Sequence, residues 1–268
     1  EFVNDAAASV LPGKTVNPEW VLTRGGSDGW SAGRAGMLYR DLIPSRLGGR
    51  FIASHIRIPD GGEVPDYVHF HKVRFQMIFC RTGWVRVVYE DQGEPFVLHA
   101  GDCVLQPPEI RHRVLESSPG LEVVEVGCPA VHETWADHAL DLPTTSIRHD
   151  RKYAGQRFVR YEAAGASWDP SEFGGFESSD TGIAAATAGL AGVRVLRARR
   201  DVNNTTTPVA SAEEFHFLFV LTGEVRVEGD AIGDHILSEG DSCVLPGGIT
   251  YSMRAARGAE LLQVKLPA

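Results

Sequence analysis

The sequence lacks the features that mark membrane proteins and nucleic-acid-binding proteins. No apolar run approaches the roughly 20 residues that a membrane-spanning helix needs. Basic residues are outnumbered, with 26 Lys and Arg against 35 Asp and Glu, and the formal net charge is -9. Because nucleic-acid binding usually requires a basic face, we expect neither a nucleic acid nor a membrane as a partner.

Cysteine is also scarce, and its spacing excludes the common zinc and redox motifs. The four cysteines are Cys80, Cys103, Cys128 and Cys243, and no CxxC pair occurs among them. Such a set predicts reduced, mostly buried thiols in a cytoplasmic protein. The chain begins with Glu1 rather than Met, so its start leaves open whether a targeting segment precedes it.

A helical pattern is missing as well, since no window shows a convincing apolar stripe with a period of 3.6 residues. From Gly36 the sequence is instead a series of short β-type runs separated by Gly, Pro or Asp, such as MLYRDLI, FIASHIRI, FQMIFC and WVRVVYE. Several runs alternate apolar and polar residues, as half-buried strands do. With 43% hydrophobic and 23% charged residues, this pattern predicts an all-β globular protein.

The series of runs occurs twice along the chain. The run RTGWVRV at 81–87 returns as LTGEVRV at 221–227, and GLEVVEV at 120–126 returns as GAELLQV at 258–264. Between them, HAGDCVLQPP returns as SEGDSCVLPGG, which matches Gly101 with Gly240 and Pro107 with Pro246. The repeat predicts two β units of ordinary domain size.

These observations divide the chain into four segments. Residues 1–30 are polar and form an N-terminal arm in which Trp20 can act as an anchor, on the barrel or on a partner subunit. Residues 31–130 form the first unit, the polar residues 131–150 form a linker, and residues 151–268 form the second unit.

The stretch VHFHKVRFQMIFCRTG at 68–83 contains the chemistry of the first repeat. On a strand with a side-chain period of two, His69 and His71 point to the same face and make half of a metal site. His112 begins a later run after the prolines of GDCVLQPPEIRH. A strand that starts there can neighbour the strand of His69 and bring a third imidazole to the same place.

The spacing HxHxxxxQxxxxxxG, followed by GxxxxxPxxxxH, resembles the two signature motifs of the cupin superfamily. Over residues 30–268 the chain resembles a bicupin, which is a pair of tandem jelly-roll β-barrels. In that family the motifs supply three histidines and usually a glutamate to a metal ion. The resemblance therefore implies that His69, His71 and His112 are ligands, with Gln76 in the place of the glutamate.

Glutamine at this position changes the charge of the predicted site. A shell of three histidines and one amide oxygen is neutral, so a divalent ion keeps its full charge and is more Lewis acidic. Gln76 can also act from outside the shell by orienting a bound water molecule. We expect a divalent metal ion, with Fe(II) favoured and with Mn, Ni, Zn and Cu as alternatives.

The second repeat has lost this set of ligands. Alignment on Gly83 and Gly223 places Val209, Ser211, His216 and Tyr251 opposite the four ligand positions of the first repeat. One imidazole does not hold a divalent ion, so we expect a degenerate site with a structural role. An organic-ligand pocket that uses Glu214, His216 and Tyr251 is the alternative.

Strand phase and proximity give further candidates for the pocket of the first repeat. We expect Arg74, Arg86 and Gln106 to bind the substrate, and Arg74 is equally compatible with a solvated surface position. The strand pattern also admits Tyr89, His55, Arg57 and Glu125 into the interior, whereas His99 is expected at the rim.

Three functions fit this site. The first is a metal-dependent dioxygenase for a small aromatic, enolic or diketone-like substrate, and it is similar to the quercetinase type of bicupin. The second is a non-redox isomerase, decarboxylase, lyase or cyclase in which the metal polarises a carbonyl group. The third is a small-molecule-binding or sensing protein without turnover. The barrel faces and the N-terminal arm are also suited to a homodimer.

Overall fold

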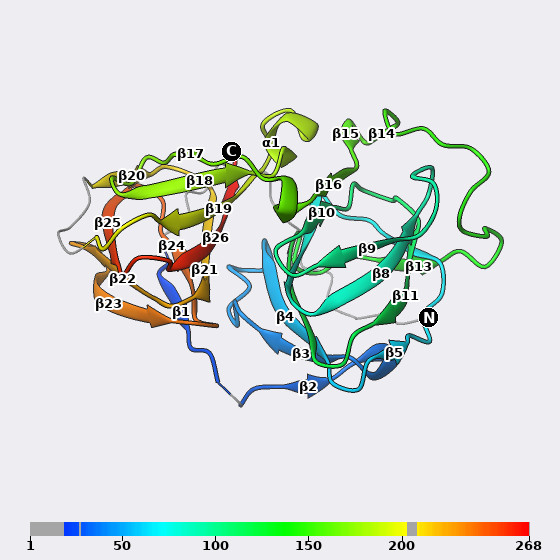
Figure 1. Ribbon diagram of the computed structural model, residues 1–268, viewed down its shortest axis with the longest axis horizontal. Helices are drawn as coiled ribbons and strands as arrows, with labels where there is room; N and C mark the ends of the chain where they lie inside the picture. Colours follow the sequence, from blue (N-terminus) through cyan, green and yellow to red (C-terminus); the bar gives the residue numbers. More distant parts are fainter. Residues whose placement is uncertain (1–18, 27, 203–207, 268) are drawn as a thin grey trace. The chain divides into compact units, whose positions relative to one another are not determined.

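The computed structural model describes residues 19–26, 28–202 and 208–267, which form two compact units (Figure 1). The first unit contains residues 29–164, and the second contains the described part of 11–28 together with residues 165–267. Each unit consists of antiparallel sheets, and helix is limited to α1 (Ile183–Ala186) and to the 3-10 turns η1 (Arg34–Gly36) and η2 (Ala163–Gly165) within the described residues. The prediction of an all-β chain with two jelly-roll barrels is confirmed.

The first unit has two main sheets. The larger contains, in spatial order, β16 (Val159–Tyr161), β10 (Cys103–Leu105), β7 (Phe75–Thr82), β12 (Leu121–Cys128), β4 (Ile52–Ile58), β3 (Leu38–Asp41) and β2 (Ser31–Ala32). The smaller contains β13 (Thr134–Ala136), β6 (His69–His71), β11 (His112–Ser117), β8 (Trp84–Tyr89) and β9 (Phe96–His99), with β5 (Gly62–Glu63) paired to β11. A separate hairpin consists of β14 (Lys152–Tyr153) and β15 (Gln156–Arg157).

The second unit repeats this arrangement with different side chains. Its larger sheet contains β1 (Val21–Thr23), β24 (Ser242–Leu245), β21 (Phe215–Thr222), β26 (Glu260–Leu266), β19 (Gly192–Ala198), β18 (Phe176–Asp180) and β17 (Asp169–Pro170). Its smaller sheet contains β20 (Val209–Ser211), β25 (Ile249–Ala255), β22 (Glu224–Gly229) and β23 (Gly233–Ser238). Buried aromatic and aliphatic side chains fill the space inside, among them Phe173, Tyr251 and Met253.

The repeated Thr-Gly pair forms the tight turn between two neighbouring strands in each unit. Gly83 has a φ of 77° between β7 and β8, and Gly223 has a φ of 79° between β21 and β22. A Cβ on Gly83 would lie 2.2 Å from the Oγ of Ser118. This turn therefore requires glycine for both its backbone angle and its lack of a side chain.

The boundaries of the units differ from those expected from sequence. Residues 21–23, expected in the arm, form β1 and pair with β24 of the second unit; residues 1–18 of the expected arm lie outside the described residues. Within the expected linker, β13 pairs with β6 of the first unit. Residues 159–161, expected in the second unit, form β16 and pair with β10 of the first. These segments extend sheet edges through long-range pairing, which local composition does not reveal.

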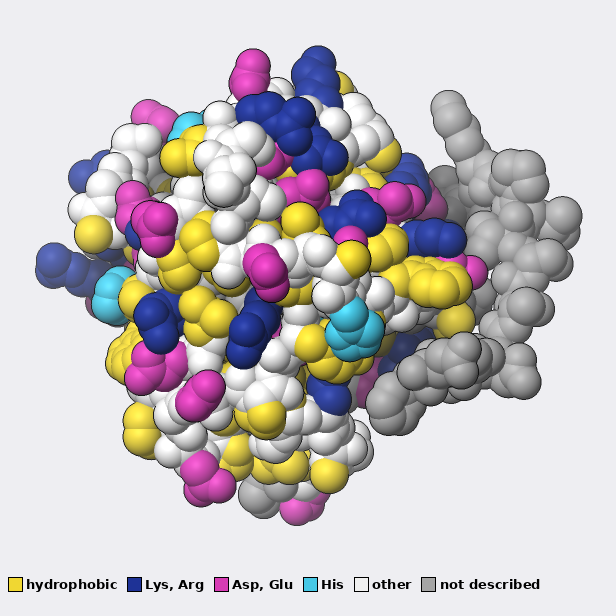
Figure 2. Space-filling view, turned by 90° about the vertical axis from the view of Figure 1, so that its right-hand side faces the viewer, with side chains coloured by type: hydrophobic (Ala, Val, Ile, Leu, Met, Phe, Trp, Pro, Cys, Tyr) yellow, Lys and Arg dark blue, Asp and Glu magenta, His cyan; other side chains and the backbone are white. Residues whose placement is uncertain are grey.

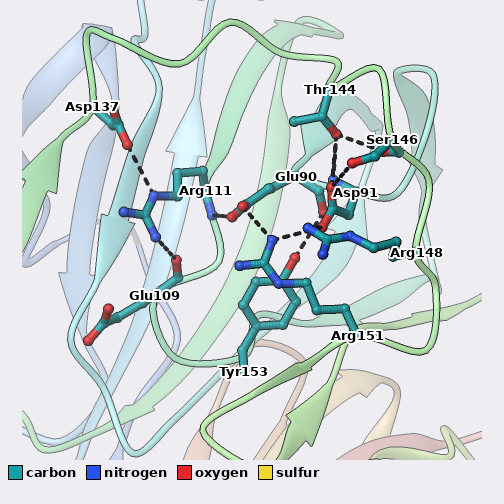
Figure 3. Close-up of polar contacts among 10 residues, drawn as sticks. All are labelled: Glu90, Asp91, Glu109, Arg111, Asp137, Thr144, Ser146, Arg148, Arg151 and Tyr153. Atoms are coloured by element: carbon teal, nitrogen blue, oxygen red, sulfur yellow. Dashed lines mark hydrogen bonds and ion pairs between the residues drawn. The ribbon is translucent and has the colours of Figure 1, made fainter.

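A polar network attaches residues 137–153 to the first unit (Figure 3). At its centre the buried Asp91 accepts hydrogen bonds from Ser146 (2.7 Å), Arg148 (2.5 Å) and Arg151 (2.7 Å). Arg151 also bonds to Glu90 at 2.6 Å. Burial opposes ionisation of Asp91, but these partners outweigh it and lower its pKa. The expected linker is therefore a fixed part of the first unit.

On the face drawn in Figure 2, positive and negative side chains are interspersed rather than gathered by sign. Among the described residues, no helix is long and apolar enough to cross a membrane. All four cysteines are buried free thiols.

Candidate metal centre

Strand pairing brings the three predicted histidines together. His69 of β6 lies directly opposite His112 of β11, and His71 follows two residues later on the same face. The ring centroids of His69 and His112 are 4.3 Å apart, and both lie within 5.3 Å of the ring of His71. One nitrogen from each ring can be chosen so that all three lie within 4.8 Å of one another.

The other nitrogen of each ring is held by a hydrogen bond. The Nδ1 atoms of His69 and His112 lie 2.8 Å and 3.0 Å from the carbonyl oxygens of Tyr67 and Ile110, and so must donate. The Nδ1 of His71 pairs with the hydroxyl of Thr134 at 2.8 Å. The two carbonyl oxygens place the lone pairs of His69 and His112 on Nε2, as metal ligands require, whereas the hydroxyl of Thr134 can donate to or accept from the Nδ1 of His71.

Burial keeps the three imidazoles neutral. It lowers the pKa of His69 to about 4, with the charge of Arg34 adding to the effect. The pKa of His71 falls well below its usual value because of burial and the neighbouring His112. Burial lowers the pKa of His112 in the same way, with a contribution from His69. All three rings are therefore in the protonation state that binds metal ions.

The cluster lines a cavity of about 460 Å³ inside the first unit. About half of the lining residues are apolar, among them Ile56, Ile58, Val85, Val87, Leu98, Leu121 and Val123. The polar half includes Gln76, Gln106 and Glu125 beside the histidines, and Arg34, Asp41 and Arg46. A chamber with both apolar and polar walls suits a small organic molecule that carries a polar group.

Gln76 is fixed by Glu125, which projects from the neighbouring strand. The amide nitrogen of Gln76 donates to a carboxylate oxygen of Glu125 at 2.5 Å. Because an ionised carboxylate only accepts, it fixes the orientation of the amide. The amide oxygen of Gln76 accepts no hydrogen bond from the described residues. It is therefore available as an oxygen ligand inside the cavity.

Two of the three Nε2 atoms accept hydrogen bonds from cavity residues. A guanidinium nitrogen of Arg34 lies 2.8 Å from the Nε2 of His69, and the amide nitrogen of Gln106 lies 2.9 Å from that of His112. Ligands about 2.1 Å from one ion lie within about 4.2 Å of each other. Small movements that exchange these two bonds for metal bonds therefore complete a site, and the donor set fits a divalent ion.

The structure separates the predicted substrate-binding residues. Gln106 is buried against His112 and accepts a hydrogen bond from the hydroxyl of Tyr89 at 3.2 Å. Arg86 contradicts the expectation, because Val85, Val87 and Tyr89 of the same strand face the cavity and the alternation turns Arg86 outward to Glu116, at 3.3 Å.

Arg74 is also misplaced by the sequence-based prediction. It is exposed in the turn between β6 and β7 and is absent from the cavity wall. His55 and Arg57 likewise lie away from the cavity and bond to Glu122. Of these further candidates, Glu125 and Tyr89 do line the cavity, and His99 is exposed as expected.

Sequence reasoning missed four residues near the histidines. Arg34 and His132 line the cavity, Asp66 holds Arg34 at 3.1 Å, and Thr134 bonds to His71. Arg34 precedes the first histidine by 35 residues in a polar stretch without strand periodicity. His132 and Thr134 lie in the expected linker. Of the four residues, only Asp66 lies close in sequence to a predicted ligand, three residues before His69.

The second unit contains a different constellation at the corresponding strands. Val209 lies opposite Tyr251 across β20 and β25, in the register that His69 and His112 have in the first unit. His216 is fully buried, and its Nε2 lies 3.3 Å from the hydroxyl of Tyr251 and 3.2 Å from the amide nitrogen of Gln263. Both His216 and Tyr251 are buried in the second unit.

Comparisons with known proteins agree with this architecture. A family model described as Cupin domain matches residues 54–126, and no curated protein matches the chain. Among solved structures, oxalate decarboxylase from Lactobacillus farciminis is similar with a TM-score of 0.66 at 12% identity, over 96% of this chain and 88% of that one. Salicylate 1,2-dioxygenase from Pseudaminobacter salicylatoxidans has a TM-score of 0.59 at 15% identity, over 81% and 71%. Procruciferin, an 11S globulin from Brassica napus, has a TM-score of 0.65 at 12% identity, over 93% and 84%.

Proposed function

The chain belongs to the cupin superfamily and has the two-barrel arrangement of a bicupin, and from this premise we propose that its first unit is a metal-dependent dioxygenase. The substrate is a small aromatic, enolic or diketone-like molecule. One observation supports the proposal above all others: three neutral imidazoles converge in the wall of one cavity of about 460 Å³.

His69, His71 and His112 would hold the ion, with the amide oxygen of Gln76 as the fourth ligand. Fe(II) is our first choice, because an imidazole and amide-oxygen shell suits it. When bound, such an ion supplies a Lewis-acidic centre and the redox capacity that dioxygen chemistry needs. Three or four protein ligands leave coordination positions for small molecules.

The chain's own residues set the conditions for the reaction. The aliphatic wall excludes water and favours a flat, apolar substrate body over a polar one. Tyr89 and Gln106 form a hydrogen-bonded pair that stands against His112 and fixes its surroundings. Glu125 holds the amide of Gln76 in one orientation. The contact with Glu125 preorganises Gln76, whereas the bond from Gln106 to the Nε2 of His112 is exchanged when a metal ion binds.

A second function is favoured by the carboxylate of Glu125 in the cavity wall. A carboxylate near a Lewis-acidic centre suits proton transfer in a non-redox isomerase, decarboxylase or lyase. The similarity in fold to an oxalate decarboxylase is compatible with this alternative, and the similarity to an 11S globulin is compatible with binding without turnover as the third function.

Oxygen consumption separates these functions. Protein loaded with Fe(II) is mixed with catechols, flavonols and 1,3-diketones in an oxygen-electrode cell while the substrate is followed by chromatography. A dioxygenase consumes one dioxygen per substrate, and His71→Ala abolishes this uptake while the exposed control His99→Ala retains it. Substrate loss without oxygen uptake favours the non-redox function. If the protein binds one of these compounds but converts none of them, the result favours the small-molecule-binding or sensing function.

A further inference from the structure

Arg34 reaches the histidine cluster from the first position of the turn η1. The turn η1 lies between β2 and β3 and is closed by a hydrogen bond from the backbone nitrogen of Gly33 to the oxygen of Met37, at 2.8 Å. A Cβ on Gly33 would lie 2.2 Å from the ring of Tyr39, so glycine lets the turn pack on that ring. Ala35 has a φ of 53°, a conformation that non-glycine residues seldom adopt.

The guanidinium of Arg34 contacts three groups, which are Asp66, the Nε2 of His69 and the hydroxyl of Tyr39. One terminal nitrogen bonds to Asp66 at 3.1 Å, and the side chain of Asp66 is only 1% exposed. The other terminal nitrogen lies 2.8 Å from the Nε2 of His69. Asp66 is itself fixed, because the backbone nitrogen of Val114 donates to its second oxygen at 3.0 Å. Arg34 is therefore held at one end by a buried acid and at the other by a proposed metal ligand.

The contact with His69 and a metal ion exclude each other. The Nδ1 of His69 donates to Tyr67, so Nε2 has the single lone pair of the ring. This lone pair accepts the hydrogen bond from Arg34, and the same lone pair would have to coordinate the metal ion. Arg34 must then leave His69, while Asp66 keeps the guanidinium beside the cluster. The released N–H group lies in the wall of the cavity.

We propose that Arg34 exchanges its bond with His69 for a bond with an anionic group of the substrate when the metal ion binds, an inference that rests on the metal site proposed above. The planar fork of a guanidinium matches the two oxygens of a carboxylate. The shell of three imidazoles and an amide also leaves the ion's positive charge largely uncompensated, and Glu125 offsets part of it. The substrate class is therefore a small monocarboxylate with an apolar or aromatic body.

Two measurements on the full chain test this exchange. The first is the affinity of metal-stripped protein for Zn(II), measured by competition with a chromophoric chelator. Arg34→Met removes the competing donor and the repelling charge, so it is expected to bind Zn(II) about tenfold more tightly. The matched control is Arg86→Met, which removes an exposed arginine from the outer face of the same unit. It is expected to leave the affinity unchanged.

The second measurement compares benzoate with its neutral isostere benzamide on Zn(II)-loaded protein, by titration calorimetry. Wild type and Arg86→Met are expected to prefer benzoate, and Arg34→Met is expected to lose about tenfold or more of that preference. Arg34→Lys retains the charge without the fork and should fall between them. Arg34→Gln replaces Arg34→Met if the latter does not fold.

The exchange is contradicted if Arg34→Met keeps the preference for benzoate, or if its Zn(II) affinity is equal to or below that of wild type. A wild-type protein without a preference for benzoate contradicts it as well. A wild-type protein that binds no metal ion contradicts the proposed function and the exchange together. A protein that binds Zn(II) at the histidines but fails the benzoate comparison contradicts the exchange alone.

Discussion

In the first unit His112 lies opposite His69 across β11 and β6, whereas in the second unit Tyr251 lies opposite Val209 across β25 and β20. The two pairs occupy equivalent positions on paired strands, and their side chains differ. In the first unit these positions border a cavity, and in the second they are part of a closed core. The barrel fold therefore does not specify a metal site, because its interior can contain either a histidine-lined cavity or a packed apolar core.

A pair of polar side chains on two neighbouring strands of the larger sheet also differs between the units. In the first unit Gln76 of β7 bonds to Glu125 of β12, and in the second His216 of β21 bonds to Gln263 of β26. The repeat aligns these positions with one another. Each unit thus keeps a polar contact at this point. In the first unit this polar contact borders the cavity, and in the second unit it is surrounded by apolar side chains.

The largest expected difference between the units appears at acid pH. In the first unit burial lowers the pKa of His55, His69, His71 and His112, whereas in the second it lowers that of His216. Between about pH 6.5 and the lowered values, the unfolded chain binds more protons than the folded chain. The free energy of unfolding therefore falls as the pH falls, by up to about 1.4 kcal/mol per pH unit for each histidine.

Hydrogen exchange measured by mass spectrometry checks this difference. In the presence of a chelator, peptides of the first unit should lose more protection than peptides of the second between pH 7 and pH 5, after correction for the intrinsic exchange rate. Equal losses in both units would show that the buried histidines do not distinguish them.

A pair of matched substitutions tests whether the first interior is open and the second is filled. Val87 and Val227 occupy equivalent positions, but Val87 lines the cavity and Val227 is fully buried in the core. Val227→Phe should lower the free energy of unfolding by about 1–3 kcal/mol through overpacking. Val87→Phe should cost less than about 1 kcal/mol, because the cavity receives the ring, and should block small-molecule binding. Denaturant unfolding measures both, and equal costs would contradict the comparison.

Much of the fold and the histidine cluster could be predicted from sequence, because strand periodicity and motif spacing are local properties. The alternation of β8 also contained the information that corrects Arg86: Val85, Val87 and Tyr89 share one face, and Arg86 lies on the other. The prediction for Arg86 failed because it placed Arg86 and Tyr89 in the interior together, although the alternation puts them on opposite faces.

The remaining site residues depend on contacts between distant segments. Arg34 reaches His69 only through the turn between β2 and β3, and Thr134 reaches His71 because β13 pairs with β6. Neither segment has a pattern that predicts its partner. The boundary near residue 151 failed for the same reason, since β16 joins the first unit through its pairing with β10.

A smaller effect is expected from moving the negative charge between the two central strands. Gln76→Glu places two carboxylates in contact, so it should lower stability without metal. The double variant Gln76→Glu with Glu125→Gln restores a hydrogen bond and brings the charge to the ligand position. It should bind a divalent ion about tenfold more tightly than wild type, which corresponds to about 1.4 kcal/mol. Chelator competition measures this, and an affinity equal to wild type would place Gln76 outside the metal's shell.

The metal content of the purified chain tests the central claim most directly. After loading with Fe(II) or Zn(II) and desalting, elemental analysis should find about one ion per chain in wild type and in Tyr251→Phe of the second unit. It should find almost none in His112→Ala. A wild-type chain without stoichiometric metal, or a His112→Ala variant that retains the wild-type content, would contradict the assignment of the metal centre to the first unit.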